Sequence, residues 1–513
     1  MAVVRVMDPQ SGRCVEYERR QPEKTVFYRI VQEHIETVFA EAEQNGSGYP
    51  EHVKHEFERF LSCGILGAGF ARLQCSTPGC KFERLVGYSC KGRSICGACL
   101  SRRMADCAAH LVDHVLPVAP YRQWTLSLPY DVRLRIGYDK KRVSNVLALF
   151  LRTVFSWQRL QARRAGIAKP LTGAVTLCQR YGSILQFTPH FHSWLPDGVF
   201  AQDGDGGVQF HRLPPPSDDD IDDLLLRVST KVDKLLFASD DDPPLDDDAQ
   251  AVLDDQAAAV KSPLQSRRFP WATGNDQPQR PRCSFFEGYS LHADLAVHSK
   301  ERRKLERLLR YGLRPPFAQK RLSLTPDGKV RLKLRKAYYT GQTEIVLEPR
   351  EFLRRLIATI PPKRQNMVRF HGVFAPRSKV RPALQELLPE KPQPEATTTE
   401  PTESTEDSEA TPFSGPGSPA EELPPVPPRY RRPWHELLKR VFDIDIICGR
   451  CGAKMHRISH IDDPDTIAHI LGHLGLPTEP PRPTPARAPP QCEFDFADFD
   501  EPELDDVEVI YVD

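Results

Sequence analysis

A cysteine-rich segment, residues 63–107, constrains the fold of this chain more than any other feature. It contains two closely spaced cysteine pairs, Cys75 with Cys80 and Cys96 with Cys99. Two short loops of this kind can turn four thiolates towards one tetrahedral Zn²⁺, which then supplies folding energy that a small segment lacks. The spacing therefore predicts a zinc ribbon, in which Cys90 or Cys63 could replace one of the four ligands.

The rest of the sequence favours metal binding over disulfide bonds for these thiols. The first residues, MAVVRVMDPQSG, show no export signal, and no run approaches the roughly 18 apolar residues that span a bilayer. We therefore expect a soluble cytoplasmic protein, in which cysteines stay reduced. The formal net charge is only +1, but basic and acidic residues are segregated into separate runs. The basic runs, which include Arg102 and Arg103 beside the cysteines, predict contacts with DNA phosphates.

Composition and periodicity predict an α+β protein with several regions. Residues 386–430 are rich in Pro, Glu, Thr and Ser with few large apolar side chains, a composition that cannot offset chain entropy. We expect a helical segment (1–62), a zinc-ribbon DNA-binding domain (63–110), a core (111–382) interrupted by an acidic insertion at about 201–280, a disordered linker (383–430), a small basic module (431–476) and a Pro-rich acidic tail (477–513).

The basic module contains a second CxxC motif, Cys448 and Cys451. No other cysteine pair lies near it in the sequence, although His456 and His460 could complete a metal site. A vestigial half-ribbon without metal is an equally acceptable interpretation.

Two histidines in the stretch QFTPHFHSWLPDG form the first candidate for a catalytic site. On a strand, His190 and His192 would point to one face while Phe191 faces the core, and Asp197-Gly198 predicts a hairpin turn just after them. Such a pair can chelate a divalent ion, although most His-x-His pairs are simply polar residues on a wet strand. His292 and Gln186 are the candidates for a third ligand.

A tyrosine on an arginine-rich helix forms the second candidate. The stretch SKERRKLERLLRYGLRPP predicts a helix with Ser299 as N-cap that ends at Gly312 and carries Tyr311 on its last turn. Cations can hold a scissile phosphate for attack by a phenol, and five arginines surround this tyrosine: Arg302, Arg303, Arg307, Arg310 and Arg314. The alternatives are a tyrosine that only packs on the core, and Tyr338 or Tyr339 as the nucleophile.

These blocks, in this order, resemble the bacterial rolling-circle insertion-sequence transposases of the IS91 type, which are HUH single-strand endonucleases. The resemblance rests on the cysteine segment, GAVTLCQRYGSILQFTPHFHSWLPDGVF, GYSLHADLAV, RYGLRPP, VRFHGVFAP and CGRCGAKMHRISHI. It implies a mainly antiparallel sheet with flanking helices. His190 and His192, with His292 as the expected third ligand, would hold Mg²⁺ or Mn²⁺ beneath Tyr311.

The resemblance also implies the reaction and the partners. Tyr311 would attack a phosphodiester of single-stranded DNA and form a 5′-phosphotyrosyl intermediate. The partners would be single- and double-stranded DNA at element ends and target, in the bacterial nucleoid. Arg307 stands one helical turn before Tyr311, and Phe370 stands where many relatives are expected to carry tyrosine, so the chain resembles the single-tyrosine variety.

Two rival functions share part of this pattern. A plasmid relaxase or rolling-circle replication initiator would have the same HUH core, but the zinc ribbon argues against it. A zinc-ribbon DNA-binding protein with a catalytically dead nuclease core, such as the product of a decayed element, would bind DNA without cleaving it. The presence of both histidines and Tyr311 argues against that reading.

Overall fold

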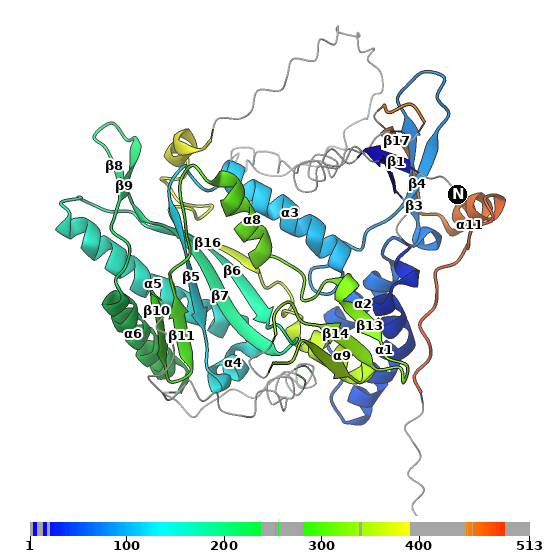
Figure 1. Ribbon diagram of the computed structural model, residues 1–513, viewed down its shortest axis with the longest axis horizontal. Helices are drawn as coiled ribbons and strands as arrows, with labels where there is room; N and C mark the ends of the chain where they lie inside the picture. Colours follow the sequence, from blue (N-terminus) through cyan, green and yellow to red (C-terminus); the bar gives the residue numbers. More distant parts are fainter. Residues whose placement is uncertain are drawn as a thin grey trace, which may run out of the picture.

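Figure 1 shows the computed structural model of the chain, a mixture of helices and antiparallel sheets. The fold class predicted from the sequence, α+β, is confirmed. The structure describes residues 4–7, 14–17, 21–237, 252, 255, 281–337, 341–389, 448, 450–453 and 455–487. Among these residues, no helix is long and apolar enough to cross a membrane.

An antiparallel seven-stranded sheet forms the centre of the molecule, and β7 lies in its interior between β5 and β6. The strand order is β10-β11-β5-β7-β6-β16, with the short β12 also paired to β5. Its strands are β5 (Tyr121–Ser127), β6 (Gly173–Tyr181), β7 (Phe187–Pro196), β10 (Cys283–Phe286), β11 (Tyr289–His292), β12 (Ala296–Val297) and β16 (Val368–Gly372).

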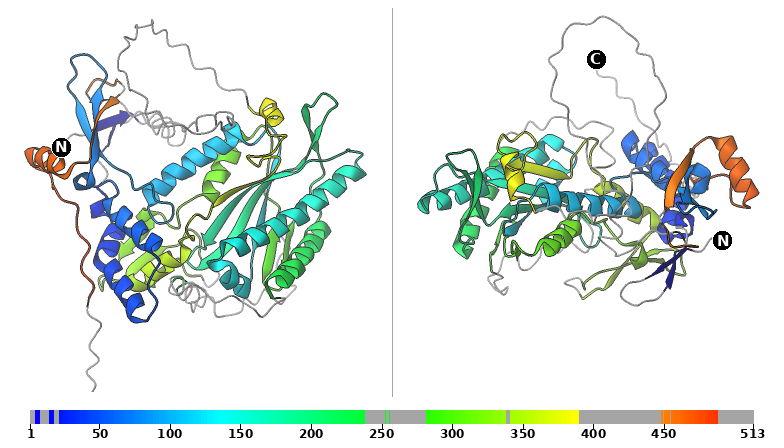
Figure 2. Two further views of the ribbon diagram at one scale, coloured as in Figure 1. Left: turned by 180° about the vertical axis from the view of Figure 1, so that it is seen from behind. Right: turned by 90° about the horizontal axis from the view of Figure 1, so that it is seen from above.

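Helices cover both faces of this sheet (Figures 1 and 2). One face packs on α4 (Tyr130–Gly137), α5 (Lys140–Arg164) and α6 (Asp218–Phe237), in a core that includes Trp124 and Phe191. The other face packs on α3 (Gly97–His114) and α8 (Arg302–Gly312). Alternate residues of each strand therefore enter different cores, as the period of two requires.

The segment expected to be an insertion is in part an integral piece of this layer. Residues 198–212 form a hairpin, β8 (Gly198–Gln202) and β9 (Val208–Arg212). The apolar stripe of α6 packs against α5, because Leu224, Leu225 and Val228 are fully buried there. Four of the acidic side chains of α6 are exposed, namely Asp218, Asp219, Asp222 and Asp223, whereas Asp220 accepts from Trp157 Nε1 at 2.8 Å. Between residues 238 and 280, the structure describes only residues 252 and 255. The rest of the expected insertion lies outside the described residues.

A second body combines the N-terminal helices with a later part of the chain. α1 (Val26–Gln44) and α2 (Glu51–Ser62) share one core with α9 (Pro349–Thr359) and with a small sheet. That sheet has the order β13-β14-β15, formed by β13 (Leu322–Leu324), β14 (Val330–Lys333) and β15 (Glu344–Leu347). Short 3-10 turns occur at Pro22–Lys24, Leu66–Ala68, Gln319–Arg321 and Ala383–Leu387.

The C-terminal part of the described chain returns to the N-terminal part. β17 (Met455–Ile461) pairs antiparallel with β3 (Phe70–Cys75), which also pairs with β4 (Glu83–Gly87). α11 (Pro464–His473) follows and packs against the turn at Leu66–Ala68. At the N-terminus, β1 (Val4–Met7) and β2 (Cys14–Tyr17) form a two-stranded sheet.

Candidate functional site

His190 and His192 lie side by side on one face of β7. Their ring centroids are 4.8 Å apart, and Phe191 between them is buried in the core on the opposite face. The strand alternation expected from the sequence is therefore present. The expected hairpin turn at Asp197-Gly198 is absent, because the chain runs directly from β7 into β8. Gly198 is needed there because a Cβ atom would lie 2.2 Å from the carbonyl oxygen of His211.

Hydrogen bonds fix the orientation of the His190 ring. Its Nδ1 lies 2.6 Å from the carbonyl oxygen of Thr188, which can only accept, so Nδ1 carries the proton. Nε2 lies 3.1 Å from Oε1 of Gln179. Burial lowers the pKa of His190 to about 4. The ring is therefore neutral near pH 7, and its Nε2 offers a lone pair towards Gln179.

Gln179 connects this histidine to α8. Its Nε2 donates to the carbonyl oxygen of Gly312 at 2.7 Å, so its Oε1 must face His190. Two acceptor atoms thus face each other across 3.1 Å. Such a pair is unfavourable unless a cation joins the two atoms. Adjacent ligands of an octahedral ion, each about 2.1 Å from it, are about 3.0 Å apart, so the spacing fits a shared divalent metal.

His192 is oriented by β5. Its Nδ1 lies 3.1 Å from Oγ1 of Thr125 and 3.2 Å from Nε2 of Gln123. Burial lowers the pKa of His192 well below its usual value, and the neighbouring His190 adds to this effect. When Nδ1 donates its proton to Thr125 Oγ1, Nε2 keeps the lone pair that can bind a metal.

Two residues were considered from the sequence as the third ligand: His292 ends β11 of the same sheet, and Gln186 immediately precedes β7. His292 is paired with Thr125, which is paired with His192, so Thr125 separates the two histidines. Gln186 turns away, because its Oε1 accepts from the backbone N–H of Ile184 at 3.0 Å. Within the part of the chain that the structure describes, His292 does not join His190 and His192 in a cluster of metal-ligating atoms.

A cavity of about 480 Å³ opens beside His192. Gln123, Thr125 and His292 line it, together with residues from the start of β10 and the end of β11. Since Gln123 and Thr125 also contact His192, the cavity adjoins the histidine face of the sheet.

Tyr311 lies at the end of α8, on the same face of the sheet as the histidines. Its side chain is 44% exposed, and the guanidinium groups of Arg314 and Arg335 lie over its ring at 4.1 and 5.0 Å. The helix approaches the sheet closely, because a Cβ atom on Gly312 would lie 2.5 Å from Leu177 Cδ1. Gln179 bridges His190 and Gly312, the residue that follows Tyr311.

The start of this helix differs from the expectation. Ser299 lies in a turn, and the helix begins only after Glu301, whose carboxylate accepts from the backbone N–H of His298 at 3.1 Å. The competing tyrosines, Tyr338 and Tyr339, lie outside the described residues.

The arginines predicted to bind DNA fall into different environments. Arg302 is directed into the protein, where it donates to the carbonyl oxygens of Val112, Leu116 and Pro117 at the end of α3. Its expected role in DNA binding is therefore corrected to a structural one. Arg303 and Arg307 are exposed on the outer side of α8, and Arg102 and Arg103 are exposed on α3.

Two further arginines, which flank Tyr311 in the sequence, have unsatisfied donors. Arg310 Nε and Arg314 Nη1 are buried, and neither has a hydrogen-bond partner among the described residues. The positive charge of Arg314 also lowers the pKa of both histidines, after the larger effect of burial. Buried, unpaired guanidinium N–H groups of this kind suit an anionic ligand such as phosphate.

The cysteines form two clusters, and their membership differs from the zinc ribbon and the possible second site at Cys448 and Cys451 that the sequence suggested. Within each cluster, the four sulfur atoms all lie within 4.8 Å of one another. The first cluster contains Cys63, Cys90, Cys96 and Cys99, and the second contains Cys75, Cys80, Cys448 and Cys451. The expected grouping of Cys75 and Cys80 with Cys96 and Cys99 is therefore corrected, because β3 and β4 carry the first pair away from the second.

The first cluster has the geometry of a tetrahedral zinc site. Cys63 Sγ lies 3.7 Å from Cys99 Sγ and 3.5 Å from Cys96 Sγ. Cys90 Sγ lies 3.4 Å from Cys99 Sγ. A Zn–S bond of about 2.3 Å places tetrahedral sulfur ligands about 3.8 Å apart. Backbone N–H groups of Cys90 and Gly92 also point to the sulfurs of Cys63 and Cys90, as expected for thiolate ligands.

Comparison with known families identifies two regions of the chain, one with the first cysteine cluster and one with the histidine strand and the tyrosine helix. Residues 30–128, which contain the first cluster, match the IS91 transposase zinc-binding domain. Residues 173–381, which contain β6, β7 and α8, match the Y2_Tnp transposase family. The chain belongs to the IS91 family of transposases. No curated protein and no solved structure matches the transposase. Membership implies that it binds and cleaves DNA, and that its zinc-binding domain holds structural zinc.

Sequence reasoning missed several residues of the transposase that the structure brings to the site. Gln179 is the most important, and only its pairing with His190 across β6 and β7 reveals it. Gln123 and Thr125 were missed for the same reason, since they belong to the neighbouring strand. A polar residue at every second position of β5, in YRQWTLS, was the signal that could have pointed to them.

Proposed function

We propose that the transposase cleaves and rejoins single-stranded DNA by transesterification at Tyr311, on the histidine face of the central sheet. The observation that carries this proposal is the chain of contacts from His190 through Gln179 to Gly312, because it ties the end of the tyrosine helix to the histidine pair. Rolling-circle transposition, as in the family that the sequence resembles, would use this reaction at element ends.

Three side chains would hold a divalent metal. His190 Nε2 and Gln179 Oε1 already face each other at the spacing of adjacent ligands, and His192 lies next to His190 on the strand. A bound Mg²⁺ or Mn²⁺ would polarise the scissile phosphate. His292, the third ligand expected from the sequence, is replaced by Gln179 in this proposal because Gln179 contacts His190 directly.

The protein's own groups would perform the rest of the step. Tyr311 Oη would attack phosphorus as the bond from phosphorus to the 3′ oxygen breaks, giving a 5′-phosphotyrosyl link and a free 3′-OH. The phenolic proton would leave to solvent, to which the side chain is exposed, and solvent would supply the proton that the departing 3′ oxygen takes up. Arg314 and Arg310 would donate their unpaired N–H groups to the phosphate oxygens. The cavity beside His192 would accommodate nucleotides next to the scissile bond.

A covalent-adduct assay tests this proposal. The full-length protein is incubated with Mn²⁺ and labelled single-stranded oligonucleotides that span both ends of its own element, and adducts that survive SDS are measured. We expect wild type and Tyr181→Phe to form the adduct and Tyr311→Phe to lose it by at least ~10³-fold. Tyr181 is the matched control because it lies nearby, with its hydroxyl bonded to the carbonyl oxygen of Arg314.

The same assay separates the alternatives. An undiminished adduct in Tyr311→Phe, which peptide mapping could assign to Tyr338 or Tyr339, would show that the nucleophile is another tyrosine. A folded wild-type protein that binds the oligonucleotides yet forms no adduct would favour the catalytically dead DNA-binding protein.

A further inference from the structure

The second cysteine cluster joins the two ends of the described chain. Cys75 and Cys80 flank the loop that follows β3, whereas Cys448 and Cys451 precede β17. Cys75 Sγ lies 3.2 Å from Cys451 Sγ, and Cys80 Sγ lies 3.7 Å from Cys448 Sγ. We propose that these four thiolates bind a second structural Zn²⁺, which fastens the C-terminal segment to the N-terminal zinc-binding domain.

The sulfur geometry supports a metal rather than disulfide bonds. A disulfide requires sulfur atoms about 2.05 Å apart, and the separations here are 3.2 and 3.7 Å. All four sulfurs lie within 4.8 Å of one another, close to the roughly 3.8 Å edge of a tetrahedral Zn–S₄ site. The matched family domain ends at residue 128, so Cys448 and Cys451 are outside it.

Backbone donors are arranged as they are in the first cluster. The N–H of Thr77 points to Cys75 Sγ at 3.4 Å, and the N–H of Arg450 points to Cys448 Sγ at 3.4 Å. In the first cluster, the N–H of Gly92 points to Cys90 Sγ at 3.3 Å, again two residues after the cysteine. Amide groups that donate to sulfur stabilise thiolate over thiol, which is the form that binds zinc.

The strands beside the cluster hold its two halves in place. Met455 is paired with Cys75 at the end of β3, and the pairing continues to Ile461 opposite Phe70. The N–H of Ile461 donates to the Tyr88 hydroxyl at 2.9 Å. Gly69 permits this approach, because a Cβ atom there would lie 2.7 Å from the Tyr88 ring and 3.2 Å from the carbonyl oxygen of Ile461.

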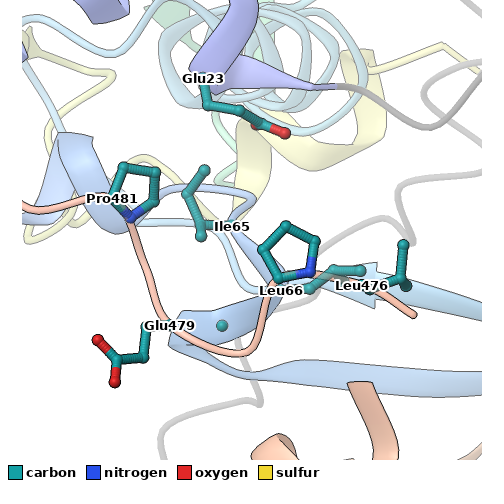
Figure 3. Close-up of a pocket in the computed structure, with 8 residues that line it drawn as sticks. Glu23, Ile65, Leu66, Leu476, Glu479 and Pro481 are labelled. Carbon is teal, nitrogen blue, oxygen red and sulfur yellow. The ribbon is translucent and has the colours of Figure 1, made fainter. Parts of the chain in front are cut away.

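Apolar packing extends the contact between the C-terminal segment and the N-terminal domain beyond β17. Ile467 and Leu471 of α11 are buried against Leu66 and Phe70. Figure 3 shows Leu476 and Pro481 of the following segment facing Ile65 and Leu66 around a small pocket.

The segment then continues along α1. The N–H of Thr484 donates to the carbonyl oxygen of Gln32 at 2.8 Å, and Gln32 Nε2 donates to the carbonyl oxygen of Arg482 at 2.9 Å. These contacts bring the two cysteine pairs together from opposite ends of the chain, which is the arrangement that a shared ion requires.

Metal stoichiometry of the full-length protein tests the proposal. Native mass spectrometry should find two Zn²⁺ per wild-type chain and one in each of two double variants, Cys75→Ser/Cys80→Ser and Cys448→Ser/Cys451→Ser. The decisive protein is the quadruple variant of these four positions, which should also retain one Zn²⁺, because both pairs serve the same ion. Cys107→Ser, outside both clusters, should retain two.

Other stoichiometries would overturn the proposal. A quadruple variant that keeps as many Zn²⁺ ions as wild type would show that these four thiolates bind no zinc, and one that loses two ions would show that the two pairs do not share an ion. If the serine variants fold poorly, Cys451→His offers a second comparison, since histidine can replace cysteine as a zinc ligand. It should retain two Zn²⁺ whereas Cys451→Ser retains one, and equal loss in both would contradict a zinc site at this position.

Discussion

Arg122 and Asp197 form a buried, two-pronged ion pair at the end of the histidine strand. Nε donates to Oδ1 at 2.7 Å and Nη2 donates to Oδ2 at 2.9 Å, and the side chains are 6% and 16% exposed. Arg122 Nη1 also donates to the carbonyl oxygen of Ala293 at 2.7 Å, just after β11. The pair therefore joins β5, β7 and the end of β11.

The first prediction concerns this ion pair. Asp197→Ala should lower the free energy of unfolding by about 3–5 kcal/mol, because it leaves the Arg122 charge buried without a partner. The matched control is Asp223→Ala, which breaks the exposed pair with Arg227 on α6 and should cost no more than about 0.5 kcal/mol. Urea unfolding followed by tryptophan fluorescence measures the free energy of unfolding of both variants. Equal losses would show that the buried ion pair contributes no more to stability than the exposed one.

The second prediction concerns the metal. Gln179→Met should weaken Mn²⁺ binding by about 10–100-fold, because it removes the oxygen that faces His190 while preserving the length of the side chain. Titration calorimetry with Mn²⁺ measures the affinity. Gln186→Met and His292→Ala are the comparisons, and both should bind Mn²⁺ as wild type does. A loss confined to His292→Ala would return the third ligand to the residue expected from the sequence.

The third prediction separates the arginines of α8. Arg302→Ala should destabilise the protein by about 2–3 kcal/mol, since three carbonyl oxygens at the end of α3 lose a charged donor. Arg303→Ala/Arg307→Ala should leave stability within about 0.5 kcal/mol of wild type, because both side chains are exposed. It should instead weaken single-stranded DNA binding.

The salt dependence of that binding provides the check. Each lost phosphate contact should reduce the slope of log affinity against log salt by about 0.7 for a single strand. Fluorescence anisotropy with a labelled oligonucleotide measures the slope. An unchanged slope in Arg303→Ala/Arg307→Ala would exclude these two side chains from the DNA-binding surface.

The fourth prediction concerns pH. Asp255 accepts from the Tyr49 hydroxyl at 2.7 Å, and burial raises the pKa of its carboxyl to about 7. The unfolded chain releases this proton near pH 4 and the folded chain only near pH 7. The stability contributed by this group is therefore complete below pH 4 and falls as pH rises to about 7.

Replacement of that carboxyl isolates its effect. Asp255→Asn should remove this loss of stability with rising pH. The melting temperature of the variant minus that of wild type should therefore increase as the pH rises from 4.5 to 7.5. Thermal unfolding of both proteins across this range gives the difference. A constant difference would mean that Asp255 titrates normally in the folded protein.

The parts of the fold that follow from local pattern could be predicted from the sequence. Phe191 enters the core because alternate residues of a strand face opposite sides, and α8 ends at Gly312, as a glycine followed shortly by Pro315 and Pro316 indicates. The family resemblance added what no local pattern could supply, namely the order of the histidine strand and the tyrosine helix in one fold.

Long-range pairing could not be predicted in this way. Cys80 and Cys448 are 368 residues apart. The entropic cost of closing a loop grows only slowly with its length, so distance along the sequence does not show which cysteine pairs with Cys80. Likewise, nothing in the letters GAVTLCQRY distinguishes Gln179 until β6 is placed beside β7 in register. Arg302 differs from Arg303 only by its position relative to α3, which depends on how two distant helices pack.

The return of β17 to β3 has a consequence for synthesis on the ribosome. At about 5–20 residues per second, the 368 residues between Cys80 and Cys448 take roughly 20–70 seconds to translate. Throughout that time β3 has one edge without its partner strand, and unpaired edges promote aggregation. A copy of the gene that has lost its 3′ end would therefore encode a chain that keeps its first zinc cluster but leaves this edge of β3 permanently unpaired.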